Sequence, residues 1–364
     1  MITVILKAGG ENILFYGKIR RVFAVFLLIF LASLLSGCTG MAASAQEYYS
    51  IGMAFYELGK FDEAEKWLNR ARQADRTMTA SQYNLGRIAF ETKKYEDAVK
   101  YFEGILKKDP DNVLALRAAA FTRIKMGDIE KAEKHYNKLL LLVPESADDG
   151  YNHALVLFAM ERYNKAEEVL EKYPFSLKDN NDLTLLYART QKALDKVEAI
   201  DTYAKWLSSN SSDKKVRYEY AQLLEKHELY ARAMEEYRTI LSDFASSSAS
   251  ASAATDEDIK KHDIHFSLAR LLLTADTESG EGITEMETAV SEGYDNIEEV
   301  EKLQKNTKVS AANRNKLRNI VNDMQRTAEA KEKETKAKEA AEKKTEENLQ
   351  KDDLPETAIE DDSR

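Results

Sequence analysis

Few side chains in this 364-residue chain have a type and spacing suited to chemistry. Cys38 is the only cysteine, and the five histidines are scattered over the whole length. His262 and His265 could share one helical face, but zinc requires further ligands and no other cysteine or histidine lies nearby. The adjacent acids Asp148 and Asp149 fit a solvated turn or helix face better than a general acid and base. We therefore expect no enzymatic activity, no bound metal and no cofactor.

Cys38 stands at the end of a segment with the features of an export signal. A basic region at 18–21 precedes an apolar run at 22–35, which is too short for a typical membrane span. The sequence Leu35-Ser36-Gly37-Cys38 then resembles the lipobox of bacterial lipoproteins. This resemblance implies that the Cys38 thiol receives a diacylglyceryl group and that the signal peptide, residues 1–37, is removed. The alternative is an uncleaved anchor whose cysteine is incidental.

Lipidation of Cys38 would decide where the protein works. The net charge of −10 gives no attraction to anionic lipid or to nucleic acid, so acyl chains on Cys38 must provide the membrane contact. Residues 38–44 form only a short linker to the rest of the chain. The residue directly after the cysteine is Thr39 rather than an aspartate, and in this respect the sequence resembles lipoproteins that are sent to the outer membrane. We expect a lipid-anchored protein of the bacterial cell envelope, in the outer membrane and facing the periplasm.

A pattern of apolar and small residues recurs about every 34 residues between positions 45 and 145. Each unit has two segments of helical periodicity separated by a short polar turn, which predicts an antiparallel helix pair. Small residues stand where the two helices should approach closely; they are Gly52, Gly86 and Ala120 in the first segments and Ala64, Ala98 and Ala132 in the second. This spacing resembles the tetratricopeptide repeat.

The pattern continues more weakly after the third unit. A fourth unit covers 147–175, where Tyr173-Pro174 should end the second helix early, and further units cover 181–213 and 214–247. The resemblance implies an all-α, right-handed superhelical solenoid of about six repeats over residues 45–247, with one concave surface. Stacking is needed because a lone helix pair cannot bury both of its apolar faces.

The remaining chain divides by composition. Residues 248–257 are rich in serine and alanine and predict a flexible linker. Residues 258–324 predict a degenerate, repeat-like helical region that ends the solenoid. Residues 325–364 form a charged tail without an apolar face, which we expect to be partly helical or disordered and detached from the core.

The resemblance also identifies candidate ligand-binding residues. In the family, positions 2, 5, 9, 12 and 13 of each first helix line the concave groove, and aromatic residues and arginine dominate binding hot spots. Carried onto this sequence, the candidate groove residues are Tyr49, Met53, Tyr83, Arg87, Phe90, Arg117, Phe121, Tyr151 and Leu155. Repeat proteins that clamp the carboxylate of chaperone tails have Lys and Asn where this chain has Tyr49 and Met53, so such a role is not expected.

These observations favour a non-enzymatic scaffold that binds a protein partner, as a peptide or helix in the concave groove, during assembly of an envelope complex. An alternative is an accessory small-molecule-binding component of an envelope transport system. An envelope enzyme is a third possibility that no motif supports. Neither nucleic acid nor a metal ion is expected as a ligand.

Overall fold

The computed structural model describes residues 44–352 except 175–176, 178–179, 247–258 and 277–279, and in this part the chain forms α-helices and no β-strand. The predicted export signal, Cys38, the serine- and alanine-rich linker and the end of the tail lie outside the described residues. The chain divides into two compact units, Met1–Leu186 and Tyr187–Arg364, which are described separately.

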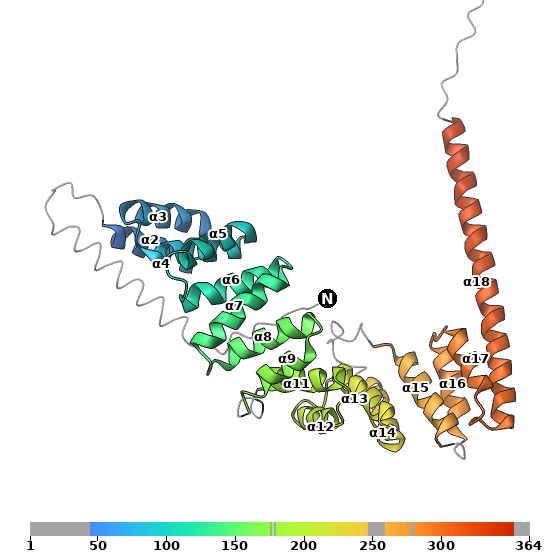
Figure 1. Ribbon diagram of the computed structural model, residues 1–364. Helices are drawn as coiled ribbons and strands as arrows, with labels where there is room; N and C mark the ends of the chain where they lie inside the picture. Colours follow the sequence, from blue (N-terminus) through green and yellow to red (C-terminus); the bar gives the residue numbers. More distant parts are fainter. Residues whose placement is uncertain (1–43, 175–176, 178–179, 247–258, 277–279, 353–364) are drawn as a thin grey trace, which may run out of the picture. The chain divides into compact units, whose positions relative to one another are not determined.

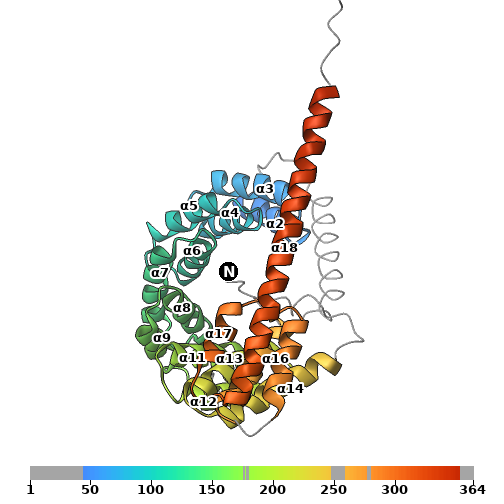
Figure 2. The same ribbon diagram turned by 90° about the vertical axis from the view of Figure 1, so that its right-hand side faces the viewer.

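The first unit consists of antiparallel helix pairs that follow one another along the chain (Figure 1). Within each pair the two helices pack together, and each new pair packs against the second helix of the previous one. In this unit the first helices lie on the inner side of the arc and the second helices on the outer side (Figure 2). The helices are α2 (Ala45–Glu57), α3 (Phe61–Ala74), α4 (Thr79–Glu91), α5 (Tyr95–Leu106), α6 (Val113–Lys125), α7 (Ile129–Leu142), α8 (Ala147–Ala159) and α9 (Tyr163–Leu170).

Glycine allows close contact between the two helices of a pair. A Cβ atom added to Gly52 would lie 2.8 Å from Leu68 Cγ, and one added to Gly86 would lie 2.6 Å from Phe102 Cε1. Both distances are shorter than a carbon–carbon van der Waals contact. The predicted role of the small residues is therefore confirmed, and Leu68 and Phe102 are almost completely buried as a result.

The turn between the two helices of a pair uses the left-handed backbone conformation at the same place in every repeat. Glycine occupies this place in the first and third pairs, where it carries no steric penalty. In the other pairs a side chain is present, although most L-residues disfavour a positive φ. The residues are Gly59 (φ 70°), Lys93 (61°), Gly127 (77°), Glu161 (57°), Asp195 (59°) and Glu228 (61°).

The fourth pair is closed by a tyrosine rather than by a full second helix. Helix α9 ends at Leu170, as the Tyr173-Pro174 sequence predicted. The Tyr173 ring lies over Gly150 of α8, where an added Cβ would be 2.1 Å from its Cε2 atom. The Tyr173 hydroxyl donates a hydrogen bond to the Pro144 carbonyl oxygen at 3.0 Å. The aromatic ring therefore occupies space that the shortened helix leaves open.

The second unit continues the helix pairs and adds a terminal helical region. Helix α11 (Asn181–Ala193) contains the division between the units, and the helices that follow are α12 (Ala199–Ser209), α13 (Lys214–Lys226), α14 (Tyr230–Ser246), α15 (Lys261–Thr274), α16 (Glu281–Ser291), α17 (Ile297–Lys305) and α18 (Ala311–Asp352). Tyr203 and Tyr237 are fully buried, as their repeat positions predict. Leu317, Val321 and Met324 of α18 are buried in one cluster with residues of α15, α16 and α17.

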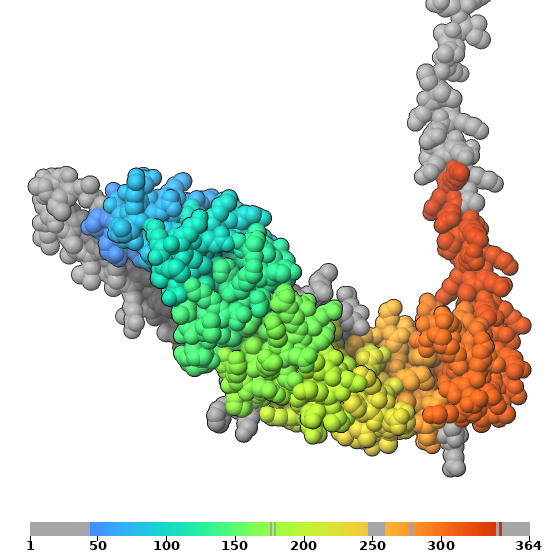
Figure 3. All heavy atoms as spheres, in the orientation of Figure 1, coloured from blue at the N-terminus to red at the C-terminus, as the bar shows by residue number. Residues whose placement is uncertain are grey.

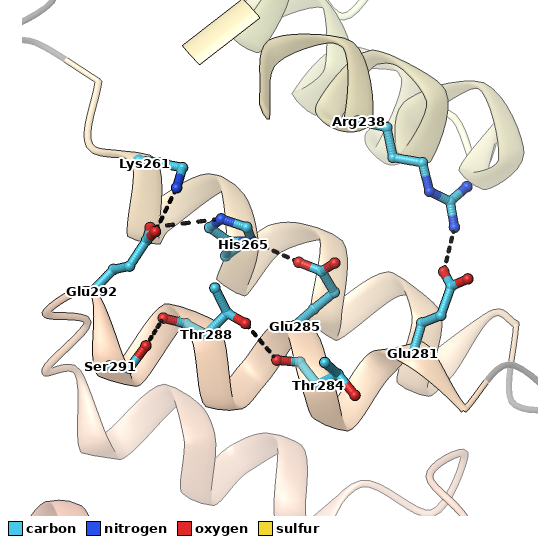
Figure 4. A network of polar contacts seen from close by, with 9 residues as sticks. All are labelled: Arg238, Lys261, His265, Glu281, Thr284, Glu285, Thr288, Ser291 and Glu292. Carbon is cyan, nitrogen blue, oxygen red and sulfur yellow. Dashed lines mark hydrogen bonds and ion pairs between the residues drawn. The ribbon is translucent and has the colours of Figure 1, made fainter. Parts of the chain in front are cut away.

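The two histidines that could have been metal ligands connect α15 to α16 and to Glu292, the residue that ends α16. Figure 4 shows the contacts of His265. His265 Nδ1 lies 2.6 Å from Glu285 Oε2, and Lys261 Nζ lies 2.5 Å from Glu292 Oε1. His262 Nδ1 lies 3.2 Å from the Glu292 carbonyl oxygen. Among the described residues, no group of three or more histidine, cysteine, aspartate or glutamate side chains could hold a metal ion. These contacts give both histidines a structural role.

Most of the predicted charged tail belongs to α18. The side chains described beyond Met324, at 325–339 and 342–343, are all exposed, and Figure 3 shows this stretch projecting from the helices at its base. Glu332 and Glu334 form ion pairs with Lys336 and Lys338, at 2.6 and 2.7 Å. Such pairs support an isolated helix by about 0.2–0.5 kcal/mol each. No helix in the described part of the chain is long and apolar enough to cross a membrane.

A reciprocal exchange at the left-handed turn position tests its backbone cost. Glu161→Gly should stabilise the first unit by about 0.5–1 kcal/mol, and Gly127→Glu should destabilise it by a similar amount, because only glycine tolerates a positive φ freely. No atom lies within 4 Å of a Cβ added at Gly127, so steric contact does not complicate the comparison. The measurement is urea denaturation followed by Trp67 fluorescence in a Trp206→Phe background.

The control is Glu168→Gly inside α9, which should destabilise the protein by about 1 kcal/mol because glycine is a poor helix former. Destabilisation by Glu161→Gly would contradict the turn argument.

A candidate binding groove on the first unit

All nine predicted groove residues lie on first helices of the pairs in the first unit, and all are half-buried. Helix α2 carries two of them, α4 three, α6 two and α8 two. This placement agrees with the repeat register, because positions three and four apart on each helix share one face. Their participation in ligand binding remains a prediction.

Five of the nine residues surround one shallow hollow of about 270 Å³; they are Tyr83, Arg87, Phe90, Arg117 and Phe121. The other four, Tyr49, Met53, Tyr151 and Leu155, do not line it. All four are on α2 or α8, and α8 contributes Asn152 to the hollow instead. The structure therefore concentrates the candidate site on α4 and α6.

Six residues outside the predicted set also line the hollow; they are Glu91, Phe102, Ala118, Thr122, Tyr136 and Asn152. Tyr136 belongs to the second helix α7, and its repeat position predicts core packing. Asn152 is adjacent to the predicted Tyr151 on α8. The repeat register gives no signal for Tyr136 as a groove residue, because the groove positions of the family lie on first helices and Tyr136 lies on a second helix.

Aromatic rings form the apolar wall of the hollow. Phe90 lies on α4 and Phe121 on α6. Their ring centroids are 5.3 Å apart, and the ring planes are tilted by 43°. Tyr83 packs against the buried ring of Phe102 with a centroid separation of 5.6 Å. Such tilted contacts hold the rings in defined orientations, and their exposed edges can contact a ligand.

Arg117 is oriented by a carboxylate of the next repeat. Its Nε and Nη2 atoms donate to Asp149 Oδ1 and Oδ2 at 2.7 and 2.6 Å, and these hydrogen bonds raise the pKa of Arg117. Asp149 is only 1% exposed, whereas the Arg117 side chain is 43% exposed. The prediction that Asp149 is a solvated acid was therefore wrong, because α8 packs against the preceding pair and covers it. Asp148, its neighbour, is exposed.

Arg87 is held by an aromatic ring and an amide. Its guanidinium carbon lies 4.5 Å from the centroid of the Tyr56 ring, and Nη1 donates to Asn84 Oδ1 at 3.1 Å. Asn84 Nδ2 in turn donates to the Tyr49 hydroxyl at 3.0 Å. Tyr49 therefore contributes to the groove indirectly, through the orientation of Arg87, rather than by lining the hollow.

One residue that lines the hollow, Tyr136, stacks on a second buried ring. Tyr136 and His153 stack with centroids 6.4 Å apart and an interplanar angle of 20°. Burial raises the pKa of Tyr136, with a further contribution from Asp149, so its hydroxyl remains neutral. Burial lowers the pKa of His153, and both of its ring nitrogens lack a hydrogen-bond partner among the described residues. His153 is therefore neutral at pH 7.

The hollow has the chemistry of a recognition surface. It combines aromatic walls, a neutral hydroxyl, an amide and two oriented guanidinium groups. These groups provide large apolar contact and directed hydrogen bonds. No cysteine, serine or histidine is among the described residues that line it.

A larger hollow, of about 470 Å³, lies away from the predicted groove. It is formed by α3, α4 and α5, with charged side chains of both signs. Lys100 and Asp97, two of these, form an exposed ion pair at 2.9 Å. This hollow therefore differs in chemistry from the predicted groove, because most of its lining side chains are charged or polar.

Comparison with known proteins shows similarity in the region that carries this groove. Models of the tetratricopeptide repeat match residues 49–113 and 89–152. A protein of Treponema pallidum (strain Nichols) described as an uncharacterized lipoprotein is 25% identical over 179 residues, which cover 49% of this chain and 91% of that protein. The protein O-mannosyl-transferase Tmtc3 of Drosophila melanogaster is 28% identical over 151 residues, which cover 40% of this chain but only 16% of the enzyme.

One of the similar proteins has a solved structure. A tetratricopeptide repeat protein from Parabacteroides merdae aligns with a TM-score of 0.46 and 22% identity, over 71% of this chain and 96% of its own. With the helical architecture described above, the repeat matches in the first unit agree with the fold expected from the sequence.

The ion pair between Arg117 and Asp149 makes a specific prediction about stability. Arg117→Met should destabilise the first unit by about 1.5–3 kcal/mol, because it leaves the buried carboxylate without its charged hydrogen-bond donor. The double variant Arg117→Met, Asp149→Leu should recover most of this loss, since both partners are then apolar. Urea denaturation of the two single variants and the double variant provides the thermodynamic cycle. Additive losses would show that the two side chains do not interact.

The buried histidine predicts a pH dependence. The folded-state pKa of His153 is lowered, so the unfolded chain binds more protons as pH falls through the ordinary histidine pKa of about 6.5. Stability should therefore decrease between pH 7.5 and 5.5, with a slope of at most about 1.4 kcal/mol per pH unit from this one proton. The measurement is the free energy of unfolding at both pH values for the wild type and for His153→Gln.

The variant should lose part of the pH dependence. His135 also has a pKa lowered by burial, so His135→Gln serves as the matched comparison and the double variant should show the smallest slope. An unchanged slope in all three variants would contradict the assignment.

Proposed function

We propose that this chain, whose residues 49–113 and 89–152 match models of the tetratricopeptide repeat, is a non-enzymatic lipoprotein that binds a protein partner at the surface of a bacterial envelope membrane. The repeats themselves indicate a scaffold for protein–protein interaction. The observation that carries the proposal is the hollow between α4, α6 and α8, in which aromatic rings and two oriented arginines come together. Residues of these types dominate the energetics of protein interfaces.

The partner that fits this hollow is a helix or an extended peptide with an apolar or aromatic anchor residue. The rings of Tyr83, Phe90 and Phe121 supply contact area for such an anchor. Arg87 and Arg117 are already held by Tyr56 and Asp149, so they can donate to peptide carbonyl groups without first losing rotational freedom. The partial neutralisation of Arg117 by Asp149 makes a highly acidic peptide a less suitable ligand.

The membrane part of the proposal rests on Cys38, which lies outside the described residues. Its support is the lipobox-like sequence and the similarity to the treponemal protein described as a lipoprotein. Each acyl methylene buried in the bilayer contributes about 0.8 kcal/mol, and two chains give a stable anchor. Confinement to one surface raises the local concentration of the repeats near a membrane-bound partner. In this proposal, that surface is the outer membrane on its periplasmic side.

The alternative of a small-molecule carrier in an envelope transport system has less support. Pockets for drug-sized ligands have volumes of about 300–1,000 Å³ and enclose most of the ligand. The hollow of about 270 Å³ is smaller than this range and is open to solvent along the groove. A side chain of a peptide fits such a hollow better than a free small molecule does.

Crosslinking in living cells tests the groove. A photoreactive residue at Phe121 or Tyr83 should capture one envelope protein, identified by mass spectrometry, because both side chains line the hollow. The matched control is the same photoreactive residue at Lys100, whose side chain is 75% exposed on α5. Arg87→Ala and Phe90→Ala should each reduce the captured amount at least about fivefold, as expected for hot-spot residues.

Circular dichroism of each variant establishes that the loss does not come from unfolding. Equal, diffuse crosslinking from the groove and from Lys100 would contradict the peptide-binding mechanism. Thermal stabilisation of the purified protein by small apolar molecules would then favour the carrier alternative.

A further inference from the structure

The first helix pair has an outer face that the other pairs of this unit do not expose. Helices α4, α6 and α8 each pack against the second helix of the preceding pair. No helix precedes α2 among the described residues. Ile51 on α2 is consequently half-buried, whereas Leu85 and Ala119, at the same position of the next two pairs, are 1% and 0% exposed. Leu58, at the end of the same helix, is 64% exposed.

An aromatic side chain of α3 completes this face. Trp67 is half-buried, and its ring lies 5.8 Å from the Tyr48 ring. One repeat later the same position is Tyr101, whose ring lies 5.9 Å from the guanidinium of Arg72 on the preceding second helix. By this register, Trp67 occupies the position that would face a preceding pair. Arg70 covers its ring at 4.5 Å.

We propose that this open face, formed by Tyr48, Ile51, Ala54, Leu58 and Trp67, rests on the lipid surface to which Cys38 attaches the protein. The inference rests on the lipid anchor of the proposed function and adds to it a second contact, which orients the repeats on the membrane. Ser44 caps α2, and Cys38 is six residues earlier. Six extended residues span at most about 20 Å, so an acylated Cys38 keeps the start of α2 within about 20 Å of the bilayer.

The side chains of this face suit the boundary between headgroups and acyl chains. Trp and Tyr concentrate at that boundary because their rings are apolar with one polar edge. Arg70, above the Trp67 ring, can reach lipid phosphate while its stem covers the ring. Two aliphatic side chains, Ile51 and Leu58, can enter the acyl region. The contact is too small to bind a membrane alone, but the covalent anchor supplies a high local concentration.

Quenching by brominated lipid tests the inference directly. The lipidated, full-length processed protein with Trp206→Phe is reconstituted into vesicles of phosphatidylethanolamine and phosphatidylglycerol, with or without bromine on the acyl chains. Trp67 is then the only tryptophan, and its emission should fall at least about twofold in brominated vesicles, as expected for an interfacial ring. The matched control carries Trp67→Phe, Trp206→Phe and Leu141→Trp, because Leu141 is 81% exposed on α7 of the same unit. Its emission should not change.

The outcomes separate this inference from the proposed function. Protein that fails to float with the vesicles would contradict the lipid anchor, and with it the contact that depends on the anchor. Protein that floats but shows equal Trp67 emission in both kinds of vesicle would overturn the membrane contact and leave the anchor intact. A dimer in detergent whose Trp67 also escapes quenching would assign the face to a second copy of the chain.

Discussion

The close approach of the two helices within each pair is the constraint on which the rest of this structure depends. Gly86 leaves no space for a Cβ atom beside Phe102, and Gly52 leaves none beside Leu68. The large side chain of each second helix is therefore buried against the backbone of the first. A pair closed in this way still has an apolar face toward each neighbour, so stability comes from stacking pairs in sequence.

This packing also explains where binding residues can occur. The second helices of the first unit each bury one large side chain in the core, namely Leu68, Phe102, Tyr136 and Leu170. One side of the first helices stays half-buried and accessible. Contacts between successive pairs then orient the accessible groups, as Asp149 of α8 does for Arg117 of α6. A hollow formed by several first helices is consequently preorganised, which reduces the entropy lost when a partner binds.

The ends of the helical array meet different requirements from its interior. In the second unit, α15, α16, α17 and the first turns of α18 share one buried cluster, which includes Val300, Leu317 and Val321. In the first unit, α2 has no preceding helix among the described residues, and Ile51 and Trp67 remain partly accessible. A terminal repeat normally carries a polar outer face for solubility. The outer face of the first helix pair instead carries aromatic and aliphatic side chains, and for this reason we assign a membrane contact to it.

The helix pairs, their register and the half-buried side of each first helix follow from the sequence alone. They depend on periodicity and on small residues at fixed spacing, which are local properties of the chain. The tertiary structure decided which candidates come together: Tyr83 and Phe121 share a hollow with Tyr136, whereas Met53 and Leu155 do not. The tertiary structure also decided that Asp149 is buried. Its partner Arg117 is 32 residues away, and the sequence around Asp149 does not indicate which helix will pack over its side chain. Contacts between repeats depend on how neighbouring pairs stack, and that geometry is absent from the pattern within any single repeat.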